Sequence, residues 1–307
     1  MKLIKPSYEI LEQSTGLEGI YRQIELAART CYKSESQITE DSAKKFVDML
    51  IARGHTAMLE HGAVYLQVPT RGDNIRSKYY HNPYSRVEYH PTGYDTGVMN
   101  ITTNYRVLIE NDWLDDLKYL CEPTEYHEKR VSVKFNTDIG VTRELNRHRV
   151  NSPAEQSTRY CNYSKDKFNN EIAISLNEDI KEYDIDYIYD KWNQVGDTSD
   201  TEIFENMCYD IGINRNANFT ILDTWLFANL AAQWSYMRLI ELGWKPEQAR
   251  RVLPLGLHTE IVHTAFVSDW KHCFDLRVDG VTGTPHIDMK ALMEPVKKEF
   301  IKRQWLE

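Results

Sequence analysis

The sequence predicts an α+β fold in which helices and strands contribute to one domain of 307 residues. Several segments place apolar residues three or four positions apart, as a helix with one buried face requires. Shorter segments alternate apolar and polar residues, as a half-buried strand requires. Hydrophobic residues make up 41% of the chain and charged residues 27%, which is ordinary usage for a folded protein. We therefore expect a single domain over residues 1–307, with two insertions at about residues 69–130 and 177–218.

The N-terminal part of the chain predicts two helices followed by a strand. Residues 17–33 carry apolar side chains at helical spacing. A second helix begins at Thr39 or Asp41, either of which can cap it, and ends near Gly54, which suits a left-handed terminal position. Residues 64–68 alternate between apolar and polar side chains, so we expect a strand there.

The first insertion has a weaker pattern. Residues 69–97 are rich in Gly, Pro, Asn, Asp and Tyr and have no lasting period, so we expect loops with short strands. After the insertion, residues 131–135 predict a strand, and residues 139–147 predict a short helix. Residues 100–120 are predicted to be helical from an apolar stripe formed by Trp113, Leu114, Leu117 and Leu120.

A strand, the second insertion and the longest helix follow. Residues 171–176 predict the strand. Residues 177–218 are acidic and rich in Tyr and Asn, and Gly196 and Gly212 break any regular element there. Residues 220–242 predict the longest helix, which carries several aromatic side chains.

The C-terminal part is expected to be mainly helical. Gly243 ends the longest helix, and Pro246 suits the first turn of a short one. Residues 257–276 are predicted to be mostly helical, and a turn-rich link follows them. The last helix begins at about Asp288, and we expect Pro295 to bend it.

Charge and cysteine content narrow the class of protein. The net charge is −9, from 37 basic and 46 acidic residues, which argues against sequence-independent nucleic-acid binding. The five cysteines are far apart and form no C-x-x-C pair, so neither a disulfide framework nor a structural zinc site is expected. The N-terminus lacks the apolar run of a signal peptide, and no stretch is long enough for a membrane span. We therefore expect a cytoplasmic protein.

Residues 143–163 are the most distinctive stretch of the sequence. They hold four arginines and a histidine interleaved with Ser, Thr, Asn and Tyr, and Pro153 stiffens the segment between two basic clusters. Guanidinium groups offer forked donors that match phosphate oxygens. The stretch therefore predicts a site for a phosphate-bearing anion, such as a nucleotide. The alternative is a solvated basic loop on the surface.

Other residues suggest different chemistry. His55, Glu60 and His61 lie at a helix-to-strand junction and invite a metal interpretation, although their spacing matches no standard motif and the more common role of each is structural. A metal-dependent nucleotide hydrolase, or a nucleotide-binding protein that uses these three residues, is the alternative function that follows. Ser157 and Cys161 are candidate nucleophiles, but no base lies near either of them in the sequence.

Phosphate binding in this chain must depend on arginines. The sequence contains neither G-x-G-x-x-G nor a Walker loop. Arg250 and Arg277 are two further arginines beside apolar residues, where a partly buried guanidinium requires an anionic or polarised partner. A salt bridge to one of the many carboxylates is the simplest role for either residue.

The arginine-rich stretch resembles the signature of the flavin-dependent thymidylate synthases, the ThyX family. In this sequence Arg147-His148-Arg149 is followed, after seven residues, by Ser157 and then by Arg159-Tyr160. Further segments resemble other parts of that family in the right order, and with the signature they cover roughly half of the chain. They are residues 28–31, 54–61, 248–255 and 276–277.

The resemblance implies an activity, cofactors and an assembly. The reaction would be the reductive methylation of dUMP to dTMP, with methylenetetrahydrofolate as the one-carbon donor and NADPH as the reductant acting through FAD. The family fold is α/β, and its members are homotetramers with active sites between subunits. The two insertions are similar to those of divergent phage-type members, which would place the protein in a host cytoplasm.

The resemblance also implies roles for individual residues. Arg277 would lie against the uracil ring and act as the catalytic residue, because a fixed cation stabilises negative charge on the ring as its C5 becomes nucleophilic. The residues expected to bind FAD are His55, Glu60, Arg147, His148, Arg149, Glu155 and His272. The residues expected to bind dUMP are Glu144, Arg147, Glu155, Gln156, Ser157, Thr158, Arg159, Arg250 and Arg277.

The sequence departs from the family pattern at several positions. Ala154 stands where the family has Asn, and Glu144 replaces the more usual Gln. His272 and residues 266–268 stand where the family often has polar contacts with the flavin. A synthase that uses Cys161 as its nucleophile is a third hypothesis, which a covalent adduct with a 5-fluorinated dUMP would reveal.

Overall fold

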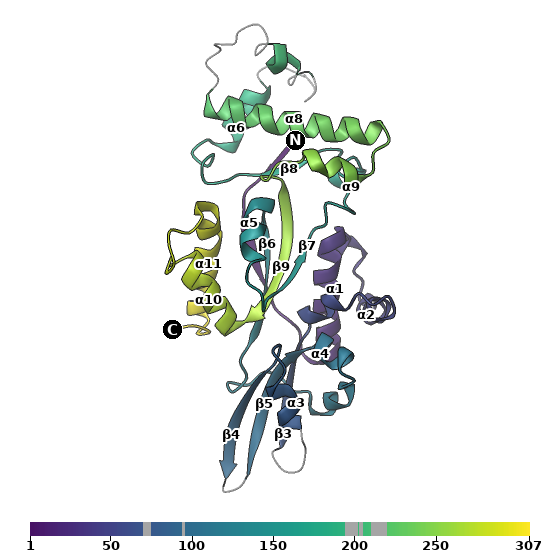
Figure 1. Ribbon diagram of the computed structural model, residues 1–307, viewed down its shortest axis with the longest axis vertical. Coiled ribbons are helices and arrows are strands. Elements are labelled where there is room, and N and C mark those ends of the chain that lie inside the picture. Colours follow the sequence, from purple (N-terminus) through teal and green to yellow (C-terminus); the bar gives the residue numbers. More distant parts are fainter. Residues whose placement is uncertain (70–74, 94–95, 194–201, 203–204, 210–219) are drawn as a thin grey trace.

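The computed structural model is elongated and confirms the predicted α+β class (Figure 1). It describes residues 1–307 except 70–74, 94–95, 194–201, 203–204 and 210–219. A four-stranded sheet lies in the middle, a helical layer lies at one end, and a three-stranded arm lies at the other end (Figure 1). The predicted breakers Gly196 and Gly212 fall outside the described residues.

The central sheet is antiparallel, with the strand order β2-β6-β9-β7. Its strands are β2 (Ser7–Leu11), β6 (Arg130–Asp138), β9 (His258–Phe266) and β7 (Ser152–Glu155). The prediction that residues 257–276 are mostly helical is wrong in its first half, because residues 258–266 form β9. All nine side chains of β9 are buried, since helices cover both faces of the strand, so the alternation that identifies a strand is missing from the sequence.

Three helices cover one face of this sheet. They are α5 (Ile139–Leu145), α10 (Val267–Arg277) and α11 (Ile287–Lys302). Their apolar side chains form a core with the strands, and Trp270 at its centre donates its indole N–H to the Val131 carbonyl at 3.0 Å. The structure confirms the predicted short helix after β6 and the final helix, which contains Pro295.

The other face packs against α1 (Gly16–Tyr32), which lies next to α2 (Ser42–Ala52). Ala27 of α1, Ala154 of β7 and Val262 of β9 meet in a small apolar cluster. Both helices confirm the sequence prediction, and Gly54 has the expected positive φ of +69°. The short helices η1 (Glu35–Gln37) and η2 (Thr56–His61) follow α1 and α2 respectively.

The arm, called the β-arm below, is a sheet of order β3-β5-β4 with its associated helices. Its elements are β3 (Ala63–Pro69), α3 (Ile75–Tyr80), β4 (Arg86–Gly93), β5 (Thr96–Asn104), α4 (Tyr105–Glu110) and η3 (Leu114–Tyr119). The prediction that residues 100–120 form one helix is wrong. Residues 100–104 belong to β5, and Asp112, with a φ of +59°, separates α4 from η3. Apolar residues three positions apart in this segment match the three-residue period of a 3₁₀ helix.

The helical layer at the other end contains the longest helix. Its elements are η4 (Asp166–Phe168), α6 (Ile185–Asn193), α8 (Ile221–Glu241), α9 (Pro246–Ala249) and η5 (Arg250–Val252). They pack beside the parallel pair β1 (Lys2–Ile4) and β8 (Ala173–Ser175). Thr220 and Asp223 form a capping box at the start of α8, and Gly243 follows its end with a φ of +93°. None of the described helices is long and apolar enough to cross a membrane.

Candidate active site

Arg277, the last residue of α10, joins this helix to a segment that is distant from it in sequence. Its Nη1 donates to the Glu144 carboxylate at 2.5 Å, and its Nη2 donates to the Glu144 carbonyl at 3.1 Å. Its Nε donates to Nε2 of His148 at 3.2 Å across a separation of 129 residues. The side chain is only 16% exposed, so these bonds hold the guanidinium in one orientation.

A cavity of about 330 Å³ lies beside Arg277. One wall is the segment that follows α5, residues 147–151, which we call the arginine loop. The other wall is one face of α10, formed by Asp269, His272, Leu276 and Arg277. The rings of His148 and His272 meet edge to face with their centroids 6.1 Å apart. The structure thus brings together five residues expected to bind the cofactor or the nucleotide, namely Arg147, His148, Arg149, His272 and Arg277.

The cavity is positively charged, and His148 in its wall is neutral. Arg147 is 70% exposed, and the nearest carboxylate oxygen, on Glu144, is 3.5 Å away. Burial, together with the neighbouring Arg277 and His272, lowers the pKa of His148 to about 4. Because Nε2 of His148 accepts from Arg277, the ring proton of neutral His148 is on Nδ1. The cavity therefore offers guanidinium donors and an imidazole N–H to an anion.

Helix α5 connects this cavity to the second half of the arginine-rich stretch. Glu155, the last residue of β7, accepts from the Thr142 hydroxyl at 2.7 Å and from the Asn146 amide at 3.3 Å. Thr142 and Glu144 are both residues of α5, so the same short helix holds both Glu155 and Arg277. Burial raises the pKa of Glu155, and its hydrogen bonds to Thr142 and Asn146 oppose that shift.

The segment after β7 runs between α1 and the region around Arg250. The backbone N–H of Ser157 donates to the Cys31 carbonyl at the end of α1, at 2.9 Å. Arg250 donates to the Thr158 hydroxyl at 3.3 Å. Arg159 is 57% exposed and pairs with Glu247 at 3.2 Å. Gln156 is buried, and its N–H donates to the Glu260 carbonyl at 2.8 Å. The residues expected to bind dUMP therefore lie in two groups, one at Arg277 and one at Arg250, with α5 between them.

His55 and Glu60 do not line the cavity. The His55 side chain is exposed, and the Glu60 carboxylate accepts from Arg106 at 2.5 Å. His61 is buried, and its Nδ1 lies 2.8 Å from the Thr264 hydroxyl. These three side chains therefore diverge, and the described residues contain no group of three His, Cys, Asp or Glu that could hold a metal ion. The alternative of a metal-dependent nucleotide hydrolase therefore has no set of metal ligands among the described residues.

The candidate nucleophiles are not activated. Cys161 is fully buried, and burial raises the pKa of its thiol, so the thiol stays protonated at neutral pH. The Ser157 hydroxyl accepts from the backbone N–H of Arg159 at 3.3 Å, so its described contact is structural. Neither arrangement supports covalent catalysis.

Two cavity residues, Asn151 and Asp269, were missed from the sequence. Asn151 donates its amide to Nε2 of the buried His263 at 2.6 Å. Asp269 precedes His272 by three positions, Leu276 by seven and Arg277 by eight, which is the spacing of one helical face. His272 lies within the helix predicted from the sequence, and one turn before it on the same face is Asp269.

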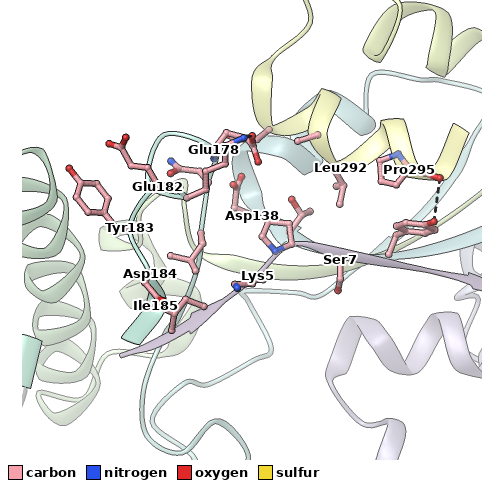
Figure 2. Close-up of a pocket in the computed structure, with 18 residues that line it drawn as sticks. Lys5, Ser7, Asp138, Glu178, Glu182, Tyr183, Asp184, Ile185, Leu292 and Pro295 are labelled. Carbon is pink, nitrogen blue, oxygen red and sulfur yellow. Dashed lines mark hydrogen bonds and ion pairs between the residues drawn. The ribbon is translucent and has the colours of Figure 1, made fainter. Parts of the chain in front are cut away.

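A larger cavity lies elsewhere and has the wrong charge for an anion (Figure 2). It measures about 740 Å³ and lies between β2, the loop before α6, and α11. It contains two lysines, Lys5 and Lys181, and the second of these is paired with Glu178. Its carboxylates are those of Asp138, Glu178, Glu182, Asp184 and Asp288. Its excess negative charge would repel a phosphate, so the smaller cavity at Arg277 is the better candidate.

Comparison with known proteins shows the family of this chain. Residues 123–302 match the Thy1 family, described as thymidylate synthase complementing protein, and the match covers more than half of the chain. The chain belongs to this family, and it is a methyltransferase of the thymidylate synthase type. The β-arm lies outside the matched residues.

Two solved structures of a UMP/dUMP methylase, PolB from Streptomyces cacaoi, are similar to this chain. The form bound with 5-Br dUMP is 16% identical, with a TM-score of 0.40, and the alignment covers 98% of this chain and 93% of PolB. The form bound with 5-Br UMP is 15% identical, with a TM-score of 0.41, and the alignment covers 98% and 91% respectively. No curated protein sequence matches the chain.

Proposed function

We propose that the protein catalyses the reductive methylation of dUMP to dTMP, with FAD as cofactor and with methylenetetrahydrofolate and NADPH as co-substrates. One observation carries the proposal. Arg277 is held by Glu144 and His148 beside Arg147 and Arg149, so fixed positive charge converges on a cavity next to the family signature. Membership of the Thy1 family supports the same reaction.

The residues present fit an anionic dinucleotide. The arginine loop presents Arg147 and Arg149 as exposed guanidinium groups, which suit the phosphates of FAD. The cavity of about 330 Å³ is at the lower end of the volume of small-molecule sites. FAD would therefore extend beyond this cavity, which supports a homotetramer in which a second subunit completes the site. FAD would supply the reducing equivalents that originate from NADPH.

Arg277 would position and polarise the uracil ring. Its guanidinium is already oriented by three hydrogen bonds, so little reorganisation is needed when negative charge develops on the ring. His148 would remain neutral and donate from Nδ1, because its Nε2 is occupied by Arg277. Glu144 would keep Arg277 in place.

The nucleotide phosphate would lie near Thr158 and Arg250. Ser157, Thr158 and Arg159 offer hydroxyl and guanidinium donors on one short segment, and Arg250 is already within hydrogen-bond distance of Thr158. A phosphate there would attract Arg159 away from Glu247, with which it forms an exposed ion pair of little strength. We expect the protein to act in the cytoplasm, where the substrates of dTMP synthesis occur.

The absorption spectrum of the purified protein tests this proposal most directly. We expect a yellow protein that converts dUMP to dTMP when it is given NADPH and methylenetetrahydrofolate. Sedimentation analysis should then show four chains per particle. A colourless protein that stays inactive after FAD is added would rule the proposal out.

A further inference from the structure

Arg130, the first residue of β6, is a buried arginine that does not line the cavity at Arg277. Its side chain is inside the protein, with a relative exposure of 8%. Its Nη1 donates to the Glu60 carbonyl at 2.7 Å, and its Nη2 donates to the Ser152 hydroxyl at 3.2 Å. Its guanidinium carbon lies 5.4 Å from the centre of the Phe266 ring, which is opposite Arg130 in the β6–β9 ladder.

The charge of Arg130 is only partly compensated by acids, because the Glu60 and Asp269 carboxylates favour its charged form without a described ion pair to it. Both described hydrogen bonds go to neutral oxygens, no described carboxylate forms an ion pair with it, and its Nε has no hydrogen-bond partner in the part of the chain that the structure describes. Burial lowers the pKa of Arg130 to about 10, so it still carries a positive charge at neutral pH. Arg29 provides a contrast, because it is equally buried but pairs with Glu25 at 2.7 Å. A buried charge without a direct ion pair is costly, and an anionic ligand nearby reduces that cost.

Arg130 also connects two segments near the cavity. Glu60 belongs to η2, and Ser152 begins β7 directly after Asn151, the last residue of the arginine loop. Asn151 is held in turn by His263, whose side chain has no exposed surface. The end of the arginine loop is therefore fixed by two buried side chains from neighbouring strands, of which Arg130 alone is charged.

We propose that Arg130 is a positioning residue that fixes the arginine loop against η2 and adds a buried positive charge behind it, so that phosphate-bearing ligands bind more tightly. This inference rests on the proposed function for the identity of the ligand. It does not rest on it for the class of ligand, which is an anion with phosphate groups. Charge in a poorly solvated region acts over a longer distance than charge in water, so direct contact with the ligand is not required.

The test measures binding to the full-length protein and two variants of Arg130. The probes are FAD, followed by flavin fluorescence, and inorganic pyrophosphate, followed by calorimetry. Arg130→Met removes the charge and both hydrogen bonds, and we expect both dissociation constants to rise roughly ten- to hundredfold, as for the loss of charged hydrogen bonds. Arg130→Lys keeps the charge but cannot bridge both oxygens, so we expect a smaller rise of about three- to tenfold. At saturating FAD, turnover of Arg130→Lys should stay within about twofold of the native value, as for a change in uniform binding.

A matched control and a double variant separate positioning from stability. Arg29→Met removes a buried arginine that has a counter-ion, so it should lower the melting temperature and leave both dissociation constants within about twofold. Ser152→Ala added to Arg130→Met should weaken binding no further if Arg130 acts partly through Ser152, since coupled residues are not additive.

The possible results are distinguishable. If native protein binds both probes and Arg130→Met binds them equally well, or if Arg29→Met loses as much affinity, the inference about Arg130 is wrong and the proposed function stands. If native protein binds pyrophosphate but not FAD, the proposed function fails, and the pyrophosphate measurements still decide the role of Arg130. If native protein binds neither, both are overturned. Should Arg130→Met not fold, Arg130→Lys gives the same decision.

Discussion

Arg277 makes three hydrogen bonds, all to residues of α5 and the arginine loop, and none of these partners is near it in sequence. We expect Arg277→Ala to abolish methylation while FAD remains bound, since the arginine loop keeps its own guanidinium groups. The loss in kcat should be at least on the order of 10²- to 10³-fold, the loss that follows removal of a fixed donor that stabilises developing charge. Product formation and the flavin spectrum of the same preparation check this. Loss of the flavin would show that the role is misassigned.

Substitutions of Glu144 test whether its negative charge or its hydrogen bond keeps the Arg277 guanidinium in its orientation. In Glu144→Gln the side-chain oxygen can still accept from Nη1 of Arg277, and the backbone carbonyl that accepts from Nη2 is unchanged. We expect this variant to keep activity within about tenfold of the native enzyme, whereas Glu144→Ala should lose more, because a charged hydrogen bond contributes about 1.5–3 kcal/mol. Steady-state kinetics on both variants would decide. Equal losses in the two variants would argue that the carboxylate charge is essential.

At the scale of single elements, the caps of α8 and α2 differ. Thr220 accepts from the N–H of Asp223 at 3.2 Å, and Asp223 bonds back to Thr220, so α8 begins with a complete capping box. Asp41 occupies the same position in α2 but makes no side-chain hydrogen bond there. We expect Thr220→Ala to reduce the free energy of unfolding by about 1 kcal/mol, and Asp41→Ala by only a few tenths. Urea denaturation of both variants measures this, and a larger effect at Asp41 would contradict it.

Elements also determine how the site is assembled. Helix α5 has seven residues, yet it carries Glu144 toward Arg277 and Thr142 toward Glu155. Its start is fixed by Asp138, which accepts from the backbone N–H of Val141 at 2.8 Å. A rigid helix start between β6 and the arginine loop therefore keeps the two halves of the site in a constant relation.

At the scale of the whole molecule, buried histidines make stability depend on pH. Burial lowers the pKa of His61 and His263 to about 3, and that of His148 and His258 to about 4. The unfolded chain takes up protons at these residues below about pH 6.5, whereas the folded chain does so only at lower pH. Their contribution to stability is therefore complete above about pH 6.5 and is lost as the pH falls through about 4.

This pH dependence can be assigned to single residues. We expect His263→Gln to lose less stability between about pH 7 and pH 4.5 than the native protein does, since one buried proton-binding group is removed. His81→Gln is the control, because His81 is exposed and its surroundings change little on unfolding. Unfolding curves measured at several pH values give the two slopes. If His263→Gln and His81→Gln show the same slope as the native protein, the buried histidines do not control acid stability.

Features that depend on near neighbours could be predicted from the amino-acid sequence alone. Helical spacing identified α1, α2, α8 and α11 near their observed positions, and alternation identified β3 and β6. The arginine loop and the segment through Arg159 could also be recognised as a candidate anion-binding stretch, because their residues are contiguous in the chain. Local periodicity arises from which face of an element is buried, and this can be read over a few turns.

The remaining features depend on contacts between distant parts of the chain. Residues 258–266 form a strand because β6 and β7 pair with them on both sides, and burial on both faces removes the pattern that would identify a strand. The contacts of Arg277 with Glu144 and His148 cross more than 120 residues, so no local pattern contains them. Likewise, His61 faces Thr264 while Glu60 faces Arg106, although the two residues are adjacent in sequence. These contacts and orientations depend on which distant surfaces pack together and bury their apolar area away from water. That is a property of the whole chain.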